Sequence, residues 1–313
     1  MDYENFCAEG GGIRGVAYAG VIQSLDELGI RKTLRRFTGS SIGSLYASLL
    51  ALNVPTDKII ETTLKIDRNK IQTNPCMLTK IYRLFRYNGI DDNSLISDFV
   101  RWVFRHCGID PDITMKEMYK NTNNELYIPG TNINRGKVYF FSHYTHPRMP
   151  IWKAITISMC FPWAWRPFEM NGDLWYDAGI SENYPIYIFN DLEKLKHGKS
   201  YDIPRHFVDS KTLGIKLLTN DERNTRQIFY GRIETGDFFS VVMALINTML
   251  LQVELGDVSQ SYIDQTIPIP NLGSSLFRLE KTREEIIAIG RESVHKYFER
   301  YKNENKDNDE TKK

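Results

Sequence analysis

The chain has 313 residues, which is enough for one large domain or two modest ones. Hydrophobic residues make up 42% of it and charged residues 25%, and the formal net charge is only +1, so the charge balance gives no reason to expect nucleic acid as a partner. The four cysteines show no C-x-x-C spacing, which argues against a zinc site and a disulfide framework and fits a reducing compartment: Cys7, Cys76, Cys107 and Cys160.

The hydropathy of the chain gives no sign of export or membrane insertion. The first five residues are polar and acidic, unlike a secretory signal. The longest apolar run, residues 238–253, contains polar side chains and is short for a bilayer-spanning helix. We therefore expect a soluble, cytoplasmic protein that could still act peripherally at a membrane surface.

The first part of the chain alternates strand and helix signals. Residues 5–9 predict a short strand, and the helical spacing that starts at Val16 ends at Gly29, a natural carboxyl cap. Residues 33–38 predict a second strand, and 45–52 predict a second helix. This order is typical of an α/β protein with a parallel sheet.

Later segments extend this pattern. A helix is expected from Thr56, and residues 67–125 look mainly helical and well placed to form a cap. Strands are expected at 126–131, 137–142, 174–176 and 212–218, the last being the final convincing strand, with a helix at 151–158. Helices should follow, including the run 238–253 and a helix that opens with the capping box Thr282–Glu285.

These elements predict a three-layer α/β/α sandwich with a mostly parallel central sheet, plus C-terminal helices. We expect a catalytic domain over residues 5–220 with the cap inserted at about 67–125, a helical extension of the same domain over 221–302, and a disordered charged tail over 303–313.

A G-x-S-x-G motif stands between the second strand and the second helix. Ser41 is its centre, and Gly39 and Gly43 flank it. A serine at a tight strand-to-helix turn is exposed for nucleophilic attack, and the following helix directs its amino end to the same point. Alone, the motif could equally be a turn followed by a serine cap.

A glycine run, residues 10–15, follows the first strand and satisfies G-x-G-x-x-G. A dinucleotide site would need an acidic residue after the second strand, but Thr38, Gly39 and Ser40 stand there. Backbone N–H groups of such a loop could instead stabilise an oxyanion. Arg14 is either an anchor for this loop or a solvated arginine at the helix start.

The base that would activate Ser41 is not evident from the six histidines, none of which lies in a recognisable motif. A triad of Ser41, Asp177 and His206 can be written in the α/β-hydrolase order. In that fold several strands precede the nucleophile, whereas only one precedes Ser41. Asp177, before Ala178 and Gly179, can also be read as a simple turn former.

Three motifs together resemble the patatin-like phospholipases over roughly residues 5–220: Glu9-Gly10-Gly11-Gly12-Ile13-Arg14-Gly15, Gly39-Ser40-Ser41-Ile42-Gly43 and Asp177-Ala178-Gly179. Residues between and after these motifs also match the family, at Trp152–Ile155, Phe161-Pro162 and Asn183–Ile186. The resemblance implies an esterase that releases fatty acids from phospholipids or other lipid esters, without a metal or other cofactor.

The resemblance also implies roles for individual residues. Ser41 would be the nucleophile and Asp177 the base, with no catalytic histidine. The amides of Gly11, Gly12 and Ile13 would form the oxyanion hole. Peripheral membrane contact is compatible with this activity, and oligomeric state is left open.

One departure supports a rival hypothesis. Ala178 occupies a position that is usually glycine in the family; if that position needs a positive φ, alanine would strain the turn by ~1 kcal/mol. The rival is a weak or inactive patatin-fold module that binds lipid or protein, and a third possibility is nucleotide binding. Retained esterase activity separates the first two, and nucleotide-dependent thermal stabilisation would favour the third.

Aromatic residues gather around the third motif: Trp152, Trp163, Trp165, Phe168 and Trp175. Core or pocket wall is the simpler interpretation. Interfacial anchors are the alternative.

Overall fold

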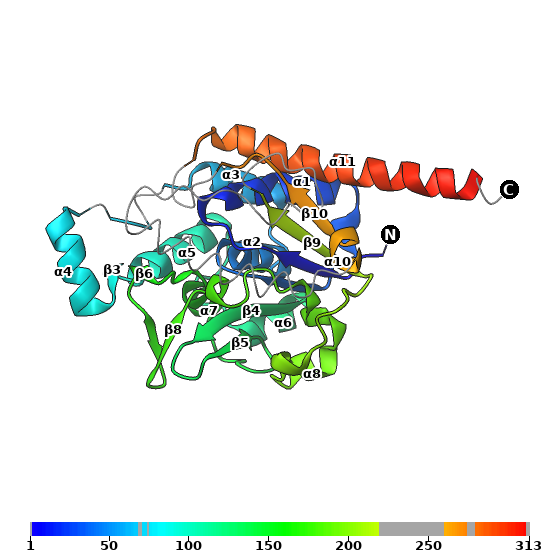
Figure 1. The fold of residues 1–313 in the computed structure, drawn as a ribbon. Helices are drawn as coiled ribbons and strands as arrows, with labels where there is room; N and C mark the ends of the chain where they lie inside the picture. The colour runs from blue at the N-terminus through cyan, green and yellow to red at the C-terminus, as the bar shows by residue number, and fades with distance from the viewer. Residues whose placement is uncertain (1, 68–70, 74, 219–259, 274–278, 311–313) are drawn as a thin grey trace.

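A computed structural model of the protein describes residues 2–67, 71–73, 75–218, 260–273 and 279–310. One mixed sheet lies at its centre (Figure 1), and its strands follow the order β10-β9-β1-β2-β4-β8-β7, with β5 also paired to β4. The first five are mutually parallel: β10 (Thr266–Ile269), β9 (Thr212–Leu217), β1 (Asn5–Ala8), β2 (Arg36–Gly39) and β4 (Glu125–Asn132). The others pair antiparallel: β5 (Lys137–Phe141), β8 (Asp173–Tyr176) and β7 (Phe168–Met170). A second, two-stranded sheet joins β3 (Gly89–Asp91) to β6 (Trp163–Trp165).

The helices of the described residues are α1 (Ala17–Glu27), α2 (Ile42–Ala51), α3 (Thr56–Leu64), α4 (Met77–Tyr87), α5 (Ser94–His106), α6 (Met115–Thr122), α7 (Ile151–Met159), α8 (Leu192–Lys196), α10 (Gln260–Asp264) and α11 (Arg283–Glu310). Short 3₁₀ helices are η1 (Gly12–Val16), η2 (Ile30–Lys32), η4 (Ala178–Ile180), η5 (Ile186–Asn190) and η6 (Ser200–Asp202). None of these helices is both long and apolar enough to cross a bilayer.

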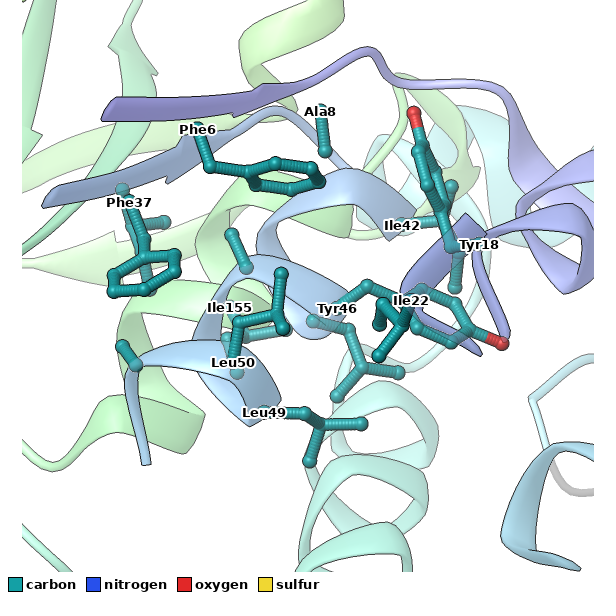
Figure 2. Packing of buried hydrophobic residues seen from close by; sticks show 14 of the residues in the cluster. Phe6, Ala8, Tyr18, Ile22, Phe37, Ile42, Tyr46, Leu49, Leu50 and Ile155 are labelled. Carbon is teal, nitrogen blue, oxygen red and sulfur yellow. The ribbon is translucent and has the colours of Figure 1, made fainter. Parts of the chain in front are cut away.

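The two faces of the sheet are covered unequally. On β1, Phe6 belongs to the main core and its neighbour Cys7 to a separate cluster, as the period-two alternation of a strand requires. The main core lies against α1, α2, α7 and α11, and Figure 2 shows Phe6 and Phe37 from β1 and β2 pointing toward side chains of α2. The other face is covered by η5 and α8, which contribute Phe189 and Leu195. The α/β/α layering is therefore confirmed, with one thin outer layer.

The C-terminal part departs from the prediction in two ways. β10 adds a parallel strand beyond β9, where we expected only helices. Pro268 lies inside it, and proline weakens a strand signal because it cannot donate to the ladder; at the end of the sheet, that loss is tolerated. α11 continues to Glu310, past the start of the predicted tail at 303, since no glycine or proline follows Gly290 to end it.

α11 begins where the capping box predicted. The Glu285 amide donates to Thr282 Oγ1 at 3.2 Å, and the Thr282 amide donates to Glu285 Oε2 at 2.7 Å. The helix packs closely on α1, where a Cβ on Gly20 would lie 1.8 Å from the Ile287 carbonyl. The predicted helix over 238–253 lies outside the described residues.

The segment 67–125, predicted as a cap, divides between core and surface. α5 buries Phe99, Val103 and Phe104 in the main core, and α6 buries Met115 and Met118 there. α4 has no buried residue and stands apart from the body in Figure 1.

Candidate active site

Ser41 occupies a sharp turn between β2 and α2. Its backbone has φ 50° and ψ −126°, a conformation that costs a non-glycine residue about 1–3 kcal/mol. The flanking glycines allow the chain to approach itself: a Cβ on Gly39 would lie 2.4 Å from the Gly43 carbonyl oxygen, and one on Gly43 would lie 2.4 Å from the Ala8 carbonyl oxygen. The G-x-S-x-G spacing is therefore required by backbone contacts among β1, β2 and α2, and the prediction of a serine at a strand-to-helix turn is confirmed.

Asp177 lies 136 residues further along the chain than Ser41 and meets it in the fold. It follows β8, and its Oδ2 accepts a hydrogen bond from Ser41 Oγ at 2.8 Å. Its Oδ1 accepts from the Gly179 amide at 2.6 Å, and its own amide donates to the Cys160 carbonyl at 2.9 Å. Each carboxylate oxygen thus has one partner, and the side chain is fixed in position.

Burial dominates the electrostatics of this carboxyl group. Asp177 is 2% exposed, and desolvation raises its pKa from 3.8 to about 7, against the smaller opposing effects of the hydrogen bonds from Gly179 and Ser41. A carboxylate with a pKa near neutrality can take up and return a proton at physiological pH. Among the described residues, neither carboxylate oxygen is hydrogen-bonded to a histidine, so Asp177 and His206 do not form the alternative triad.

The glycine loop lies beside the serine. A Cβ on Gly10 would be 3.1 Å from Ser41 Cβ, and the Gly10 amide donates to the Asn183 carbonyl at 3.1 Å. η1 begins directly after Gly11, so the loop supplies N–H groups from the first turn of a helix, where no intrahelical acceptor exists. Arg14 Nε donates to the Gly11 carbonyl at 3.2 Å, which fits the first of the two interpretations of Arg14, an anchor for this loop.

A buried ion pair holds the residue that directly precedes the glycine loop. Glu9, at the end of β1, lies 3.0 Å from Lys216 Nζ, and both side chains are less than a tenth exposed. The second carboxylate oxygen of Glu9 accepts from the Leu217 amide at 2.7 Å, and Asn183 Nδ2 donates to the first at 3.3 Å. This network ties β1, β9 and the segment after Asp177 together around the glycine loop. The sequence signal for this network is Lys216 itself, a lysine inside a mainly apolar strand at 212–217.

One further contact at the site had no sequence signal, and the turn at Ala178 differs from the expectation of strain. Ser158, on the apolar helix α7, accepts a hydrogen bond from the Ser41 amide at 3.0 Å through its Oγ. Ala178 begins the 3₁₀ turn η4, and neither it nor Gly179 has a positive φ. The strain that alanine would suffer at a positive φ is therefore absent.

The fold and the site together describe an α/β protein with a serine at a strand-to-helix elbow, hydrogen-bonded to a buried aspartate. A family model described as Patatin-like phospholipase matches residues 6–190, more than half of the chain. The chain belongs to the patatin-like phospholipase family.

Two relatives in sequence are viral proteins. Uncharacterized protein R571 of Acanthamoeba polyphaga mimivirus is 26% identical over 296 residues, covering 93% of this chain and 92% of that protein. A protein named probable lipid hydrolase 463L, from Invertebrate iridescent virus 6, is 29% identical over 202 residues, covering 64% of this chain and 68% of its own.

Solved structures share the fold at low identity. VipD from Legionella pneumophila superimposes with a TM-score of 0.58 at 15% identity, over 96% of this chain and 67% of VipD. The type III effector ExoU of Pseudomonas aeruginosa gives a TM-score of 0.50 at 16% identity, over 96% of this chain and 53% of ExoU. The chain thus spans about half of the ExoU structure, and these two likenesses concern the fold alone.

Proposed function

We propose that the protein hydrolyses acyl esters of lipids, as a phospholipase A or lysophospholipase, with Ser41 as nucleophile and Asp177 as base. Family membership supports lipid hydrolase activity, as does the likeness to a protein named as a probable lipid hydrolase. The observation that carries the assignment of residues is the 2.8 Å hydrogen bond from the strained Ser41 to the buried carboxylate of Asp177.

The proposed reaction has two steps and moves one proton through Asp177 in each. Asp177 accepts the hydroxyl proton as Ser41 Oγ bonds to the ester carbonyl carbon, and returns it to the departing alcohol oxygen. Water then attacks the acyl-enzyme with Asp177 as base again, which releases the fatty acid and restores Ser41. A pKa of about 7 suits both directions of transfer near neutral pH.

The negative charge that develops on the carbonyl oxygen needs donors that are already in place. We assign this role to the amides of Gly11, Gly12 and Ile13, at the start of η1 beside Ser41. The amino end of α2, for which Ser41 is the N-cap, adds favourable partial positive charge. One such donor is typically worth about 10²–10³ in turnover.

We favour an active enzyme over the competing inactive module, because Ala178, the residue that suggested the module, lies in a 3₁₀ turn without a positive φ. The substrate we propose is a phospholipid or another lipid ester. We propose that the protein works in the cytoplasm and reaches this substrate at a membrane surface.

The test measures release of free fatty acid from mixed phospholipid vesicles in excess chelator, comparing the wild type with Ser41→Ala. We expect release by the wild type alone. Equal release by both proteins would remove Ser41 from the mechanism, and no release by either would favour the binding module. Ser44→Ala is a matched control, because Ser44 lies one turn away on α2 and donates to the Ser41 carbonyl at 2.6 Å rather than to Asp177.

A further inference from the structure

Helix α4 presents a ridge of large apolar side chains to solvent. Leu78 is 80% exposed and Phe85 is 84% exposed, and between them Ile81 and Tyr82 are 47% and 61% exposed. These four residues stand at i, i+3, i+4 and i+7, so they share one face of the helix. An amphipathic helix normally turns this face to the core; α4 turns it outward.

This concentration is unusual for the surface of this protein. Of the ten large hydrophobic residues that are exposed among the described residues, five lie on α4, Met77 being the fifth. The others are scattered singly or in pairs over the rest of the chain. Trp165 and Trp175, candidates for interfacial anchors in the sequence, are buried at 6% exposure. An exposed apolar patch of this kind marks an interaction surface.

The charge beside the ridge identifies the kind of surface that it fits. α4 carries Lys80, Arg83 and Arg86 and no acidic residue, whereas the whole chain has a net charge of only +1. On a helical wheel Arg86 lies beside the ridge, whereas Lys80 and Arg83 lie on the far side of the helix, where Arg83 also pairs with Asp91 at 3.7 Å. An apolar face with a cation at its border and further cations on the opposite face is typical of a helix that lies between the headgroups and acyl chains of an anionic bilayer, with Tyr82 as an amphipathic ring at the same level.

α4 is also connected to the candidate active site. Its C-cap residue Asn88 accepts a hydrogen bond through its carbonyl oxygen from Tyr176 Oη at 3.2 Å, and Tyr176 directly precedes Asp177. The Arg166 guanidinium lies 3.7 Å from the centre of the Tyr87 ring, and β3, which follows α4, pairs with β6. A surface bound by α4 would therefore lie near β8, the strand that Asp177 follows.

We propose that α4 is an interfacial anchor, which inserts the ridge formed by Leu78, Ile81, Tyr82 and Phe85 into an anionic lipid bilayer. The membrane is the source of the lipid ester in the proposed function, and the physiological purpose of the anchor rests on that function. Binding of α4 to the membrane does not depend on the proposed function, because it needs neither Ser41 nor Asp177.

The experiment measures binding to sedimented vesicles in a Ser41→Ala background, so that no lipid is consumed. The probes are phosphatidylcholine vesicles with and without phosphatidylserine. Leu78→Ser/Phe85→Ser should weaken binding to the anionic vesicles by at least about tenfold, because each side chain loses its transfer into the apolar layer. Arg86→Gln should weaken it by about fivefold on anionic vesicles and leave binding to phosphatidylcholine alone unchanged.

The matched control is Tyr201→Ser/Phe207→Ser, which removes two exposed aromatic residues elsewhere, 66% and 39% exposed. Binding should be unchanged in that variant. Since no residue of α4 is buried, and Tyr201 and Phe207 are exposed as well, both double variants should keep the native melting temperature.

The proposal would be overturned if the Ser41→Ala protein did not bind vesicles, or if both double variants bound them equally well. It would also be overturned if light scattering showed that the α4 variant had lost a dimer while its vesicle binding was unchanged. The last result would make the ridge an interface between two copies of this chain. Hydrolysis of a soluble short-chain ester, measured with Ser41 intact, tests the proposed function separately from the membrane anchor. The rate of this hydrolysis should be unaffected by Leu78→Ser/Phe85→Ser. If the wild type did not hydrolyse the ester, the proposed function would be contradicted, and vesicle binding would still test the anchor.

Discussion

Replacing Asp177 with asparagine should abolish turnover and make the folded protein more stable above neutral pH. The asparagine side chain is nearly the same size and could still accept from the Gly179 amide, but it cannot take up a proton from Ser41. The stability of the native protein carries a cost from keeping a carboxylate in a buried position, and the neutral amide removes that cost.

The magnitude follows from the shift in the pKa of Asp177, from 3.8 to about 7. In the unfolded chain this carboxyl ionises above pH ~4, while in the native protein it keeps its proton until about pH 7, so the native state binds more protons between these values. Its contribution to the free energy of unfolding is therefore greatest below pH ~4 and falls by ~1.4 kcal/mol per pH unit up to pH ~7. Over about three pH units the free energy of unfolding of the wild type therefore falls by ~4 kcal/mol, and this loss is absent in the asparagine variant.

The assay is urea unfolding of the wild type and of Asp177→Asn between pH 4 and pH 8. Asp173→Asn, on β8, is the control, because hydrogen bonds from Arg135 and Asn132 hold the pKa of Asp173 below its usual value. Its wild-type carboxylate stabilises the fold above the unfolded pKa of ~4, and this contribution is lost only below that pH, so the difference between the wild type and Asp173→Asn should stay constant from pH 4 to pH 8. A difference between the wild type and Asp177→Asn that does not grow from pH 4 to pH 7 would refute the reasoning.

Other consequences concern the loop, the turn and the base. Gly11→Ala should reduce turnover by about 10²–10³ without global unfolding, because the added Cβ meets the Leu217 side chain at 2.6 Å and shifts the proposed oxyanion donors; an unchanged rate would locate the donors elsewhere. Ala178→Gly should cost about 0.4–1 kcal/mol in urea unfolding and leave turnover within about twofold, whereas a large gain in turnover would indicate strain at Ala178. Glu9→Gln should cost about 3–5 kcal/mol by the same measurement, because it removes the negative charge beside Lys216, which is 5% exposed; a cost below about 1 kcal/mol would contradict a structural ion pair. On a soluble ester, kcat/KM should rise about tenfold per pH unit toward pH 7 and level off above, as Asp177 loses its proton; a rate independent of pH there would argue against this base.

The N-terminal half of the site was predictable because its signals are local. Each of its elements depends on residues that are close together in the sequence. These elements are the first strand, the glycine loop, the helix that ends at Gly29 and the serine turn at Ser41. Backbone approach explains why: Gly39 and Gly43 are required by contacts made inside the same short segment and with β1.

The pairing of Ser41 with Asp177 spans 136 residues, and no periodicity connects them. Only the resemblance to a family suggested it, since an aspartate before a small residue and glycine is otherwise an ordinary turn. Ser158 had no signal at all, because a single serine in an apolar helix has many explanations. β10 was missed because Pro268 interrupts its pattern. For residues 67–125 the sequence predicted only a mainly helical cap, and nothing in it indicated that α4 turns an apolar ridge to solvent.

The most direct measurement is labelling with a long-chain fluorophosphonate, in which the serine oxygen displaces fluoride from phosphorus, followed by mass spectrometry of the peptides. We expect a single adduct on Ser41, and a much slower reaction in Asp177→Asn although that variant remains folded. Labelling of a different residue, or equally fast labelling of Ser41 in both proteins, would contradict the proposal that Asp177 activates Ser41.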